Sequence, residues 1–364
     1  MTTARTPDSL PLLTGALDQA RGDWPEFGLG DDIRPSLEAA RAAGEDCALV
    51  TLFQARGGAP RGVGAQMLVR RGGVSGFLSG GCIEADVTLN ALAVLDDGIP
   101  RRLVYGEGGP VDIRLPCGGR VEILVERLAA DDAAAGDLLK AWHERRPTIW
   151  LSDGTVRSCR GDAETNAAFP DIAGLADVGT EGTIYRRSFP QPRLVVFGYD
   201  PMVLALCSMA VQSGVETWLI RPKGPPAPPP VPGLRYLHTS PAEDLGRIGV
   251  DRWTGVVVAM HDDIDDRDAL AVSLPSQAGY VGLLGAKRHL PRKLEQLRRK
   301  GLAPESLSRL RAPVGLPIGG RSPWQIAISI LAEFTQWSNA EQKRFFRPDA
   351  PDASLQTGAP RTAG

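Results

Sequence analysis

An apolar run at 194–198 (LVVFG) ends in glycine and is followed at once by a helix-like pattern at 202–213. A second apolar run, at 216–220 (ETWLI), comes directly after that helix. The order strand, turn, helix, strand is typical of a parallel sheet, because parallel neighbours need a crossover connection. Apolar runs at 256–260 and 280–284 fit two later strands of the same sheet. This half of the chain is therefore predicted to be a Rossmann-like parallel α/β domain.

The first half of the chain has shorter apolar runs separated by glycine-rich turns. Strand candidates lie at 48–54, 65–70, 74–78, 102–105 and 120–126, and helix candidates at 33–43 and 85–95. Two of the turns, 79–84 (SGGCIE) and 115–119 (LPCGG), each carry a cysteine. The predicted fold class is α/β, with a small N-terminal α/β domain that contains Gly-rich cysteine turns, followed by the Rossmann-like domain.

The domain organisation follows from these patterns, since 364 residues are enough for two domains of ordinary size. We expect an extension at 1–35, a first domain at 36–130, a connecting region at 131–192, the Rossmann-like domain at 193–340 and a tail at 341–364. The connecting region is polar with weak periodicity, and we expect it to be a poorly packed connection with a few strands at about 145–190. The tail is expected to be disordered. A proline-rich stretch at 223–231 favours an extended loop or linker, with a PxxP ligand as the alternative.

Charge and composition argue against several classes of protein. The net charge of −2 is close to zero, whereas a nucleic-acid-binding protein usually carries a large positive charge. No apolar stretch reaches the ~20 residues that a membrane span needs, and the N-terminus has no signal-peptide pattern. We therefore expect a cytoplasmic protein with no membrane partner. Five scattered cysteines without a CxxC pair favour neither a disulfide framework nor a structural zinc site.

The first cysteine turn places Cys82 at the start of a helix. Gly80 and Gly81 allow the backbone to come close to a ligand. A helix start favours the thiolate form of a cysteine, which is the form that binds metals and transfers sulfur. The alternative is a glycine turn with a buried, inert cysteine.

The second cysteine turn places Cys117 beside Gly118 and Gly119. A lone cysteine in a turn is more often structural, but two Gly-flanked cysteines in one small domain favour a shared site. Soft thiolates suit a metal-binding or sulfur-transfer role at such a site.

A third glycine-rich loop, at 56–64 (RGGAPRGVG), carries Arg56 and Arg61 among exposed backbone N–H groups. Loops of this composition bind anions, phosphates included, because fixed guanidinium and N–H donors converge on the oxygens. The alternative is a solvated basic loop.

The turn after the first strand of the Rossmann-like domain departs from the dinucleotide fingerprint GxGxxG. Gly198 matches the first glycine, but Asp200 stands at the second and would repel a pyrophosphate. Pro201 also removes a backbone N–H donor. The next strand ends in Arg221 where an acidic residue is expected for the ribose. These residues argue against NAD, while NADP or a phosphorylated ligand contacted by Arg221 is the alternative.

A run of acidic residues at 260–270 (MHDDIDDRDAL) follows an apolar strand, so His261 stands at that strand's carboxyl end. Open α/β sheets bind ligands at this edge. A histidine with several carboxylates can hold a hard or borderline metal, although the spacing fits no specific motif. The alternative is a capped helix start with solvated acids.

These segments together resemble the XdhC/CoxI family of maturation factors. In the first domain the resemblance runs through AQMLV, SGGCIEADV and LPCGGRVEILVE. In the second it runs through VVVAMHDDIDDRDAL, YVGLLGAKRHLPRKLEQL and APVGLPIGGRSPWQIAISILAEF. It covers roughly residues 45–127 and 193–335, and the combination of the two cysteine turns with the last segment is specific.

The resemblance implies a chaperone more than a catalyst, one that binds the molybdenum cofactor as molybdopterin or its dinucleotide form. Such proteins promote exchange of an oxo ligand for sulfur and deliver the cofactor to a xanthine-dehydrogenase-type molybdenum hydroxylase. A cysteine desulfurase partner supplies the sulfur, and a homodimer is plausible. The implied cofactor-binding residues are Arg61, Gly80, Gly81, Cys82, Glu84, Cys117, Gly118, Gly119, Gly198 and His261, with Cys82 and Cys117 as candidate molybdenum contacts. That either thiol accepts sulfur as a persulfide is our own hypothesis, based on the chemistry of a thiolate near molybdenum.

The chain departs from the family pattern at three places. The family usually has a GAGH-type turn at 198–201, an Asp-x-Arg at 221–223 and a GSxPR loop where this chain has GGAPR at 57–61. The first two changes weaken any inherited nucleotide site, whereas the cysteine turns are intact. The alternative function, which the Rossmann-like domain would allow, is an NAD(P)-dependent oxidoreductase.

Overall fold

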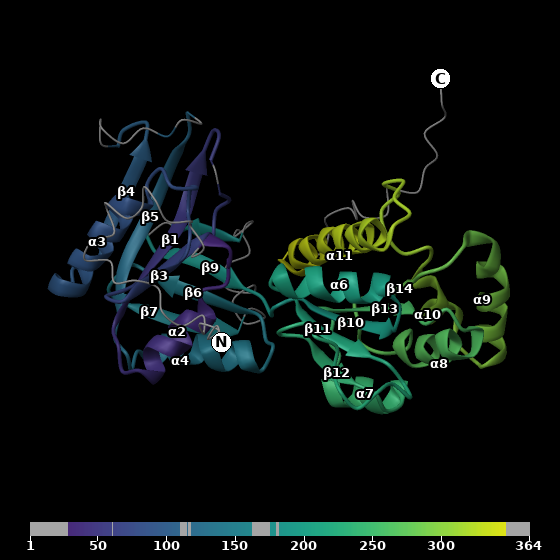
Figure 1. Ribbon diagram of the computed structural model, residues 1–364. Coiled ribbons are helices and arrows are strands. Elements are labelled where there is room, and N and C mark those ends of the chain that lie inside the picture. The colour runs from purple at the N-terminus through teal and green to yellow at the C-terminus, as the bar shows by residue number, and fades with distance from the viewer. Residues whose placement is uncertain are drawn as a thin grey trace, which may run out of the picture. The chain divides into compact units, whose positions relative to one another are not determined.

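The chain divides into two compact units, residues 1–190 and 191–364, which are shown in Figure 1. The computed structural model describes residues 28–59, 61–109, 115, 118–161, 175–179 and 182–346. Three predicted features therefore lie outside the described residues: most of the N-terminal extension, Cys117, and the tail beyond 346. Both units are mixed α/β structures, as the sequence predicted, and the second holds the parallel sheet.

The first unit is built on a five-stranded antiparallel sheet in the order β3-β2-β1-β5-β4. Its strands are β1 (Cys47–Arg56), β2 (Gln66–Arg70), β3 (Gly73–Gly76), β4 (Arg101–Gly106) and β5 (Arg120–Leu128). Side chains alternate between the two faces along β1, so Val50 and Leu49 belong to different apolar cores. Helix α3 (Glu84–Asp97) covers the Val50 face with its own buried side chains Val87 and Val94.

The opposite face of this sheet is covered by α2 (Arg34–Ala42), α4 (Ala133–His143) and part of a second sheet. That sheet has four strands in the order β7-β6-β9-β8: β6 (Thr148–Ser152), β7 (Arg157–Gly161), β8 (Ala176–Val178) and β9 (Ile184–Ser188). These elements occupy the stretch expected to be a connecting region. Trp150 is buried among them and donates its indole N–H to buried Glu126, which ties β6 to β5.

The second unit has a six-stranded parallel sheet in the order β12-β11-β10-β13-β14-β15. The strands are β10 (Arg193–Gly198), β11 (Glu216–Ile220), β12 (Arg235–Leu237), β13 (Thr254–Ala259), β14 (Tyr280–Leu283) and β15 (Leu310–Arg311). β10 lies in the middle of the sheet. The chain adds β11 and β12 on one side of β10 and then β13, β14 and β15 on the other side. The carboxyl ends of β10 and β13 therefore flank the point where ligands bind in sheets of this type.

Helices cover both faces of this sheet (Figure 1). They are α6 (Pro201–Gln212), α7 (Pro241–Ile248), α8 (Asp263–Ser273), α9 (Leu290–Arg299), α10 (Pro304–Ser308) and α11 (Pro323–Phe346), with a short 3₁₀ turn η2 (Lys287–His289) before α9. α6 and α11 pack together on one face, while α7 and α8 cover the other. Among the described residues, no helix is both long and apolar enough to cross a bilayer.

Candidate functional site

Three glycine-rich loops gather at one end of the first sheet. Because the sheet is antiparallel, β1, β3 and β4 end where β2 and β5 begin. The described residues of the connections 57–65, 77–83 and 107–119 therefore lie at that end, and we call them together the loop edge. Of the first-domain residues that the sequence assigned to a cofactor site, the loop edge contains Arg61, Gly80, Gly81, Cys82, Gly118 and Gly119. Glu84 is the first residue of α3, directly after the loop edge, and Cys117 lies outside the described residues.

Two loops of the loop edge touch through their glycine backbones. Gly58 and Gly118 form an isolated parallel bridge. A Cβ atom on Gly119 would collide with the carbonyl oxygen of Gly58, and one on Gly106 would collide with the carbonyl oxygen of Gly119. The backbones can approach this closely only because these residues are glycines. The arginine-bearing loop and the second cysteine turn are thus neighbours, although Cys117 itself lies outside the described residues.

The carboxylate of Glu84 fills the first cysteine turn. Only 7% of Glu84 is exposed. Its two oxygens accept hydrogen bonds from the backbone N–H groups of Leu78, Ser79, Gly80, Gly81 and Ile83 and from the hydroxyl of Ser79. Gly80 and Gly81 have φ angles of 108° and 110°, which side-chain-bearing residues rarely adopt. The chain's own anion therefore occupies the donors that the sequence suggested for a ligand.

The electrostatics of Glu84 agree with this geometry. Burial alone would raise its pKa, but hydrogen bonds from the Ser79 hydroxyl and from the N–H groups of Ser79 and Leu78 outweigh burial and hold the pKa below its usual value. Glu84 is therefore ionised at neutral pH and holds the turn in shape. The Cys82 N–H donates to the Ser79 hydroxyl at 3.0 Å, and the Cys82 side chain is exposed at the start of α3.

Arg61 lies beside the chain segment that leads into the Cys82 turn. Its guanidinium stacks over the Phe77 ring, with 4.5 Å from the guanidinium carbon to the ring centroid. It also forms a 2.7 Å ion pair with Asp31, whose side chain is 66% exposed. An exposed partner of this kind is easily displaced by a stronger anion.

Gly198 and His261 belong to the second unit, where Gly198 ends β10 and His261 follows the carboxyl end of β13. A Cβ atom on Gly198 would lie 2.5 Å from Val203 Cγ2 and 2.8 Å from the carbonyl oxygen of Ala259, so glycine is needed for close packing. Asp200 caps α6 by accepting from the Val203 N–H at 2.8 Å. Its other oxygen lies 2.7 Å from His261 Nε2. A side-chain carboxylate thus occupies the place where a dinucleotide phosphate would bind.

The acidic run after β13 is used within the fold. Asp262 caps α8, and the N–H groups of Asp265 and Ile264 lower its pKa. Asp266 accepts from the Met260 N–H and pairs with Lys293. In the described part of the chain, no three histidine, cysteine, aspartate or glutamate side chains are grouped as metal ligands. The arrangement is that of a capped helix start.

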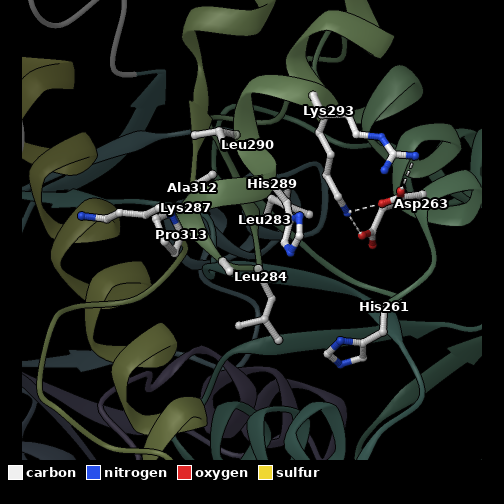
Figure 2. Close-up of a pocket in the computed structure, with 14 residues that line it drawn as sticks. His261, Asp263, Leu283, Leu284, Lys287, His289, Leu290, Lys293, Ala312 and Pro313 are labelled. Atoms are coloured by element: carbon white, nitrogen blue, oxygen red, sulfur yellow. Dashed lines mark hydrogen bonds and ion pairs between the residues drawn. The ribbon is translucent and has the colours of Figure 1, made fainter.

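The sequence interpretation missed a cavity of about 370 Å³ next to these residues (Figure 2). Its lining includes His261, Asp263, Gly285, Lys287, His289 and Lys293. The segment GAKRH, 285–289, directly follows the apolar run at 280–284, and its position after a parallel strand was the available signal.

Comparison with known proteins places these features in a family. A profile described as the XdhC and CoxI family matches residues 40–106, and one described as the XdhC Rossmann domain matches residues 194–334. The chain is 30% identical over 310 residues to the molybdenum cofactor insertion chaperone PaoD of Escherichia coli (strain K12), covering 84% of this chain and 88% of that protein.

One further sequence relative and one solved structure agree with this family. The chain is 26% identical over 339 residues to a probable xanthine dehydrogenase subunit of Bacillus subtilis (strain 168), covering 82% of this chain and 96% of that protein. A solved structure described as a xanthine dehydrogenase from Bacillus halodurans shares the fold, with a TM-score of 0.65 and 22% identity over 87% of this chain and 98% of that one.

Proposed function

Because the chain belongs to the XdhC and CoxI family, we propose that it binds the molybdenum cofactor and passes it to a molybdenum hydroxylase of the xanthine dehydrogenase type. The relative with 30% identity is by name a molybdenum cofactor insertion chaperone. In this role the cofactor is cargo, and the protein's task is to hold it, shield it and release it to a client enzyme.

The observation that carries this proposal is the gathering of unlike donors at the loop edge. Cys82 offers an exposed thiol, and thiolate sulfur is a soft ligand suited to a metal such as molybdenum. Arg61 offers a guanidinium that can bind the pterin phosphate through two parallel hydrogen bonds. Cys117 precedes Gly118, which bridges to Gly58 in the arginine-bearing loop, so its thiol is the second proposed molybdenum contact.

Each residue of the loop edge has its own proposed task. Glu84 is a positioning residue, because its carboxylate holds the turn from which Cys82 projects. Gly118 and Gly119 let the second cysteine turn approach the arginine-bearing loop. Arg61 is the phosphate-binding residue, since its guanidinium rests on Phe77 and forms its ion pair with an exposed carboxylate that a phosphate can displace.

Several finer features remain parts of the proposal. They are exchange of an oxo ligand for sulfur on the bound cofactor, a cysteine desulfurase as sulfur donor, a homodimeric state and a cytoplasmic location. The form of the cofactor, molybdopterin or its dinucleotide, also belongs here.

An NAD(P)-dependent oxidoreductase is the alternative for a Rossmann-like unit. The carboxylate of Asp200 caps α6 and contacts His261 at the position where a pyrophosphate would have to bind. An anionic side chain at this point repels a pyrophosphate, so the geometry favours the chaperone.

The proposal is tested by measuring molybdenum and pterin retained by the full-length protein after incubation with the cofactor and gel filtration. We expect binding at about one cofactor per chain, weakened about tenfold, or ~1.4 kcal/mol, in Cys82→Ser and in Arg61→Ala. Cys159→Ala is the matched thiol control, because burial raises the pKa of that thiol to about 11 and it packs against the apolar cluster of α2 and α4.

Two outcomes would count against the proposal. A folded wild-type protein that retains no intact cofactor would overturn the function. Retention that is unchanged in both loop-edge variants, or weakened equally in Cys159→Ala, would remove the site from the loop edge.

A further inference from the structure

The pocket of the second unit lies at the carboxyl ends of β13, β14 and β15 (Figure 2). His261 follows β13, Gly285 follows β14, and Pro313 follows β15. Its volume of about 370 Å³ falls within the range of small-molecule sites, roughly 300–1,000 Å³. The carboxyl edge of a parallel sheet is also where such sites occur.

The acidic side chains of this pocket are already neutralised. Asp266 is 2% exposed, accepts the Met260 N–H and pairs with Lys293. Asp263 lies 3.6 Å from Lys293 and 3.4 Å from Arg292. Lys287 takes part in none of the ion pairs found among the described residues, and its side chain is exposed. The lining therefore has an excess of positive charge.

The loop after β14 adds hydrogen-bond donors to that charge. The Leu284 N–H still bonds to β13, through the carbonyl oxygen of Val258 at 2.9 Å. Among the hydrogen bonds between described residues, none is donated by the next three N–H groups, at 285–287. A Cβ atom on Gly285 would meet no atom within 4 Å, so open space lies beside the backbone here.

His289 supplies a further donor. Its Nε2 lies 3.1 Å from the Arg288 Nε, which can only donate, so Nε2 must accept. In the neutral ring the proton therefore sits on Nδ1, which can donate to a ligand. Figure 2 shows the rings of His289 and His261 in the same opening, with Lys293 and Asp263 along one side.

From this arrangement we propose that the pocket is an anion site that binds the phosphate group of a ligand through Lys287, His289 and the loop N–H groups at 285–287. A phosphate monoester presents several acceptor oxygens and a double negative charge, which match fixed N–H donors and a lysine. The Asp200 turn of the same sheet cannot play this part, because its own carboxylate occupies the helix start. The site does not depend on the proposed cofactor function, because the residue proposed to bind the cofactor's phosphate is Arg61 of the first unit.

The test is titration of the full-length protein with inorganic phosphate by calorimetry at low ionic strength, then with a nucleoside 5′-monophosphate. We expect one phosphate per chain and an affinity weakened tenfold or more in Lys287→Ala and in His289→Gln. Arg299→Ala is the matched control, because it removes one exposed positive charge from α9 outside the pocket and should change the affinity less than twofold.

A second arm identifies the source of the phosphate. A nucleoside monophosphate that binds more tightly than phosphate, and loses that affinity in Lys287→Ala, would indicate a nucleotide. Equal affinities for the nucleoside monophosphate and for inorganic phosphate, both lowered in Lys287→Ala, would indicate a ligand that is recognised by its phosphate group alone. Either result supports the site.

Three findings would overturn it: no phosphate binding by the wild type, equal weakening in Arg299→Ala, or loss of phosphate binding in Arg61→Ala with the pocket variants unaffected. The last would place phosphate binding in the first unit. Because cofactor retention is measured separately with Cys82 variants, failure of this pocket leaves the chaperone proposal standing, and failure of the chaperone proposal leaves this pocket standing.

Discussion

Each unit contains a strand-to-helix turn that the sequence singled out as part of a candidate ligand site, and each turn holds a carboxylate of the chain itself. At α3 the carboxylate is Glu84, buried and surrounded by five backbone N–H groups and a hydroxyl. At α6 it is Asp200, which receives one backbone N–H and contacts His261. The first turn has its shape because of the carboxylate, whereas the second has its shape because Gly198 lets the elements pack closely.

The difference shows how a ligand turn can be reused within a fold. A carboxylate that accepts hydrogen bonds from many buried donors stabilises the turn itself. The residue available to a ligand is then one that the turn exposes, which here is Cys82. A carboxylate with few partners mainly excludes other anions from its place. Substitutions at the two turns should therefore lower the free energy of unfolding by different amounts, and each should affect only the unit that contains it.

The largest effect is expected from Glu84→Ala. Removing the carboxylate leaves several buried N–H groups without acceptors, and each costs about 1–3 kcal/mol, partly relieved by water. We expect the free energy of unfolding of the first unit to fall by about 3 kcal/mol or more, measured by hydrogen exchange of peptides from each unit in urea. Glu84→Gln, which keeps one acceptor oxygen, should lose less. A loss below about 1 kcal/mol in Glu84→Ala would contradict the structural role.

Gly198→Ala should have the next largest effect, confined to the second unit. The added methyl group would overlap Val203 and the Ala259 carbonyl, and overpacking of this kind costs about 1–3 kcal/mol. Gly80→Ala is the matched comparison, because its Cβ would meet no atom and the cost is backbone strain alone. Exchange rates of peptides from 193–213 and 77–90 should report the two changes separately.

Acidification is expected to have a smaller effect on the stability of the first unit. The folded pKa of Glu84 lies below its usual value of 4.5, so its contribution to stability is complete above about pH 4.5 and is lost as the pH falls through the folded pKa. The first unit should therefore lose stability on acidification, and Glu84→Gln should flatten this dependence. Unfolding in urea at a series of pH values from 7 to 3 checks it; parallel curves for the two proteins would argue against the linkage.

The smallest effect is expected from Asp200→Ala. Loss of a helix N-cap costs about 1 kcal/mol, and the cap is only one hydrogen bond here. Asp200→Asn should keep the cap and be nearly neutral for stability. If Asp200→Ala destabilised the second unit as much as Glu84→Ala destabilises the first, the two carboxylates would be equivalent and the comparison would fail.

Several structural features followed from the sequence because they depend on local pattern. The parallel sheet was predicted from buried runs such as 194–198, since strands covered on both faces are almost wholly apolar. The family was predicted from the cysteine turns and the C-terminal segment, and the two profile matches confirm it. A few strands were expected around Trp150, but not that they pair into one packed sheet, because they are short and bury polar residues such as Arg187 and Ser188.

The sequence by itself determined that the chain is α/β, that its second half is Rossmann-like, and which family it belongs to. Only the tertiary structure decided that Glu84 accepts the turn's N–H groups, that Gly58 meets Gly118, and that Lys287 and His289 line one pocket with His261. The physical reason is that secondary structure follows from periodicity along a few residues. The direction of a carboxylate and the approach of two loops are set by contacts between segments that are far apart in the chain.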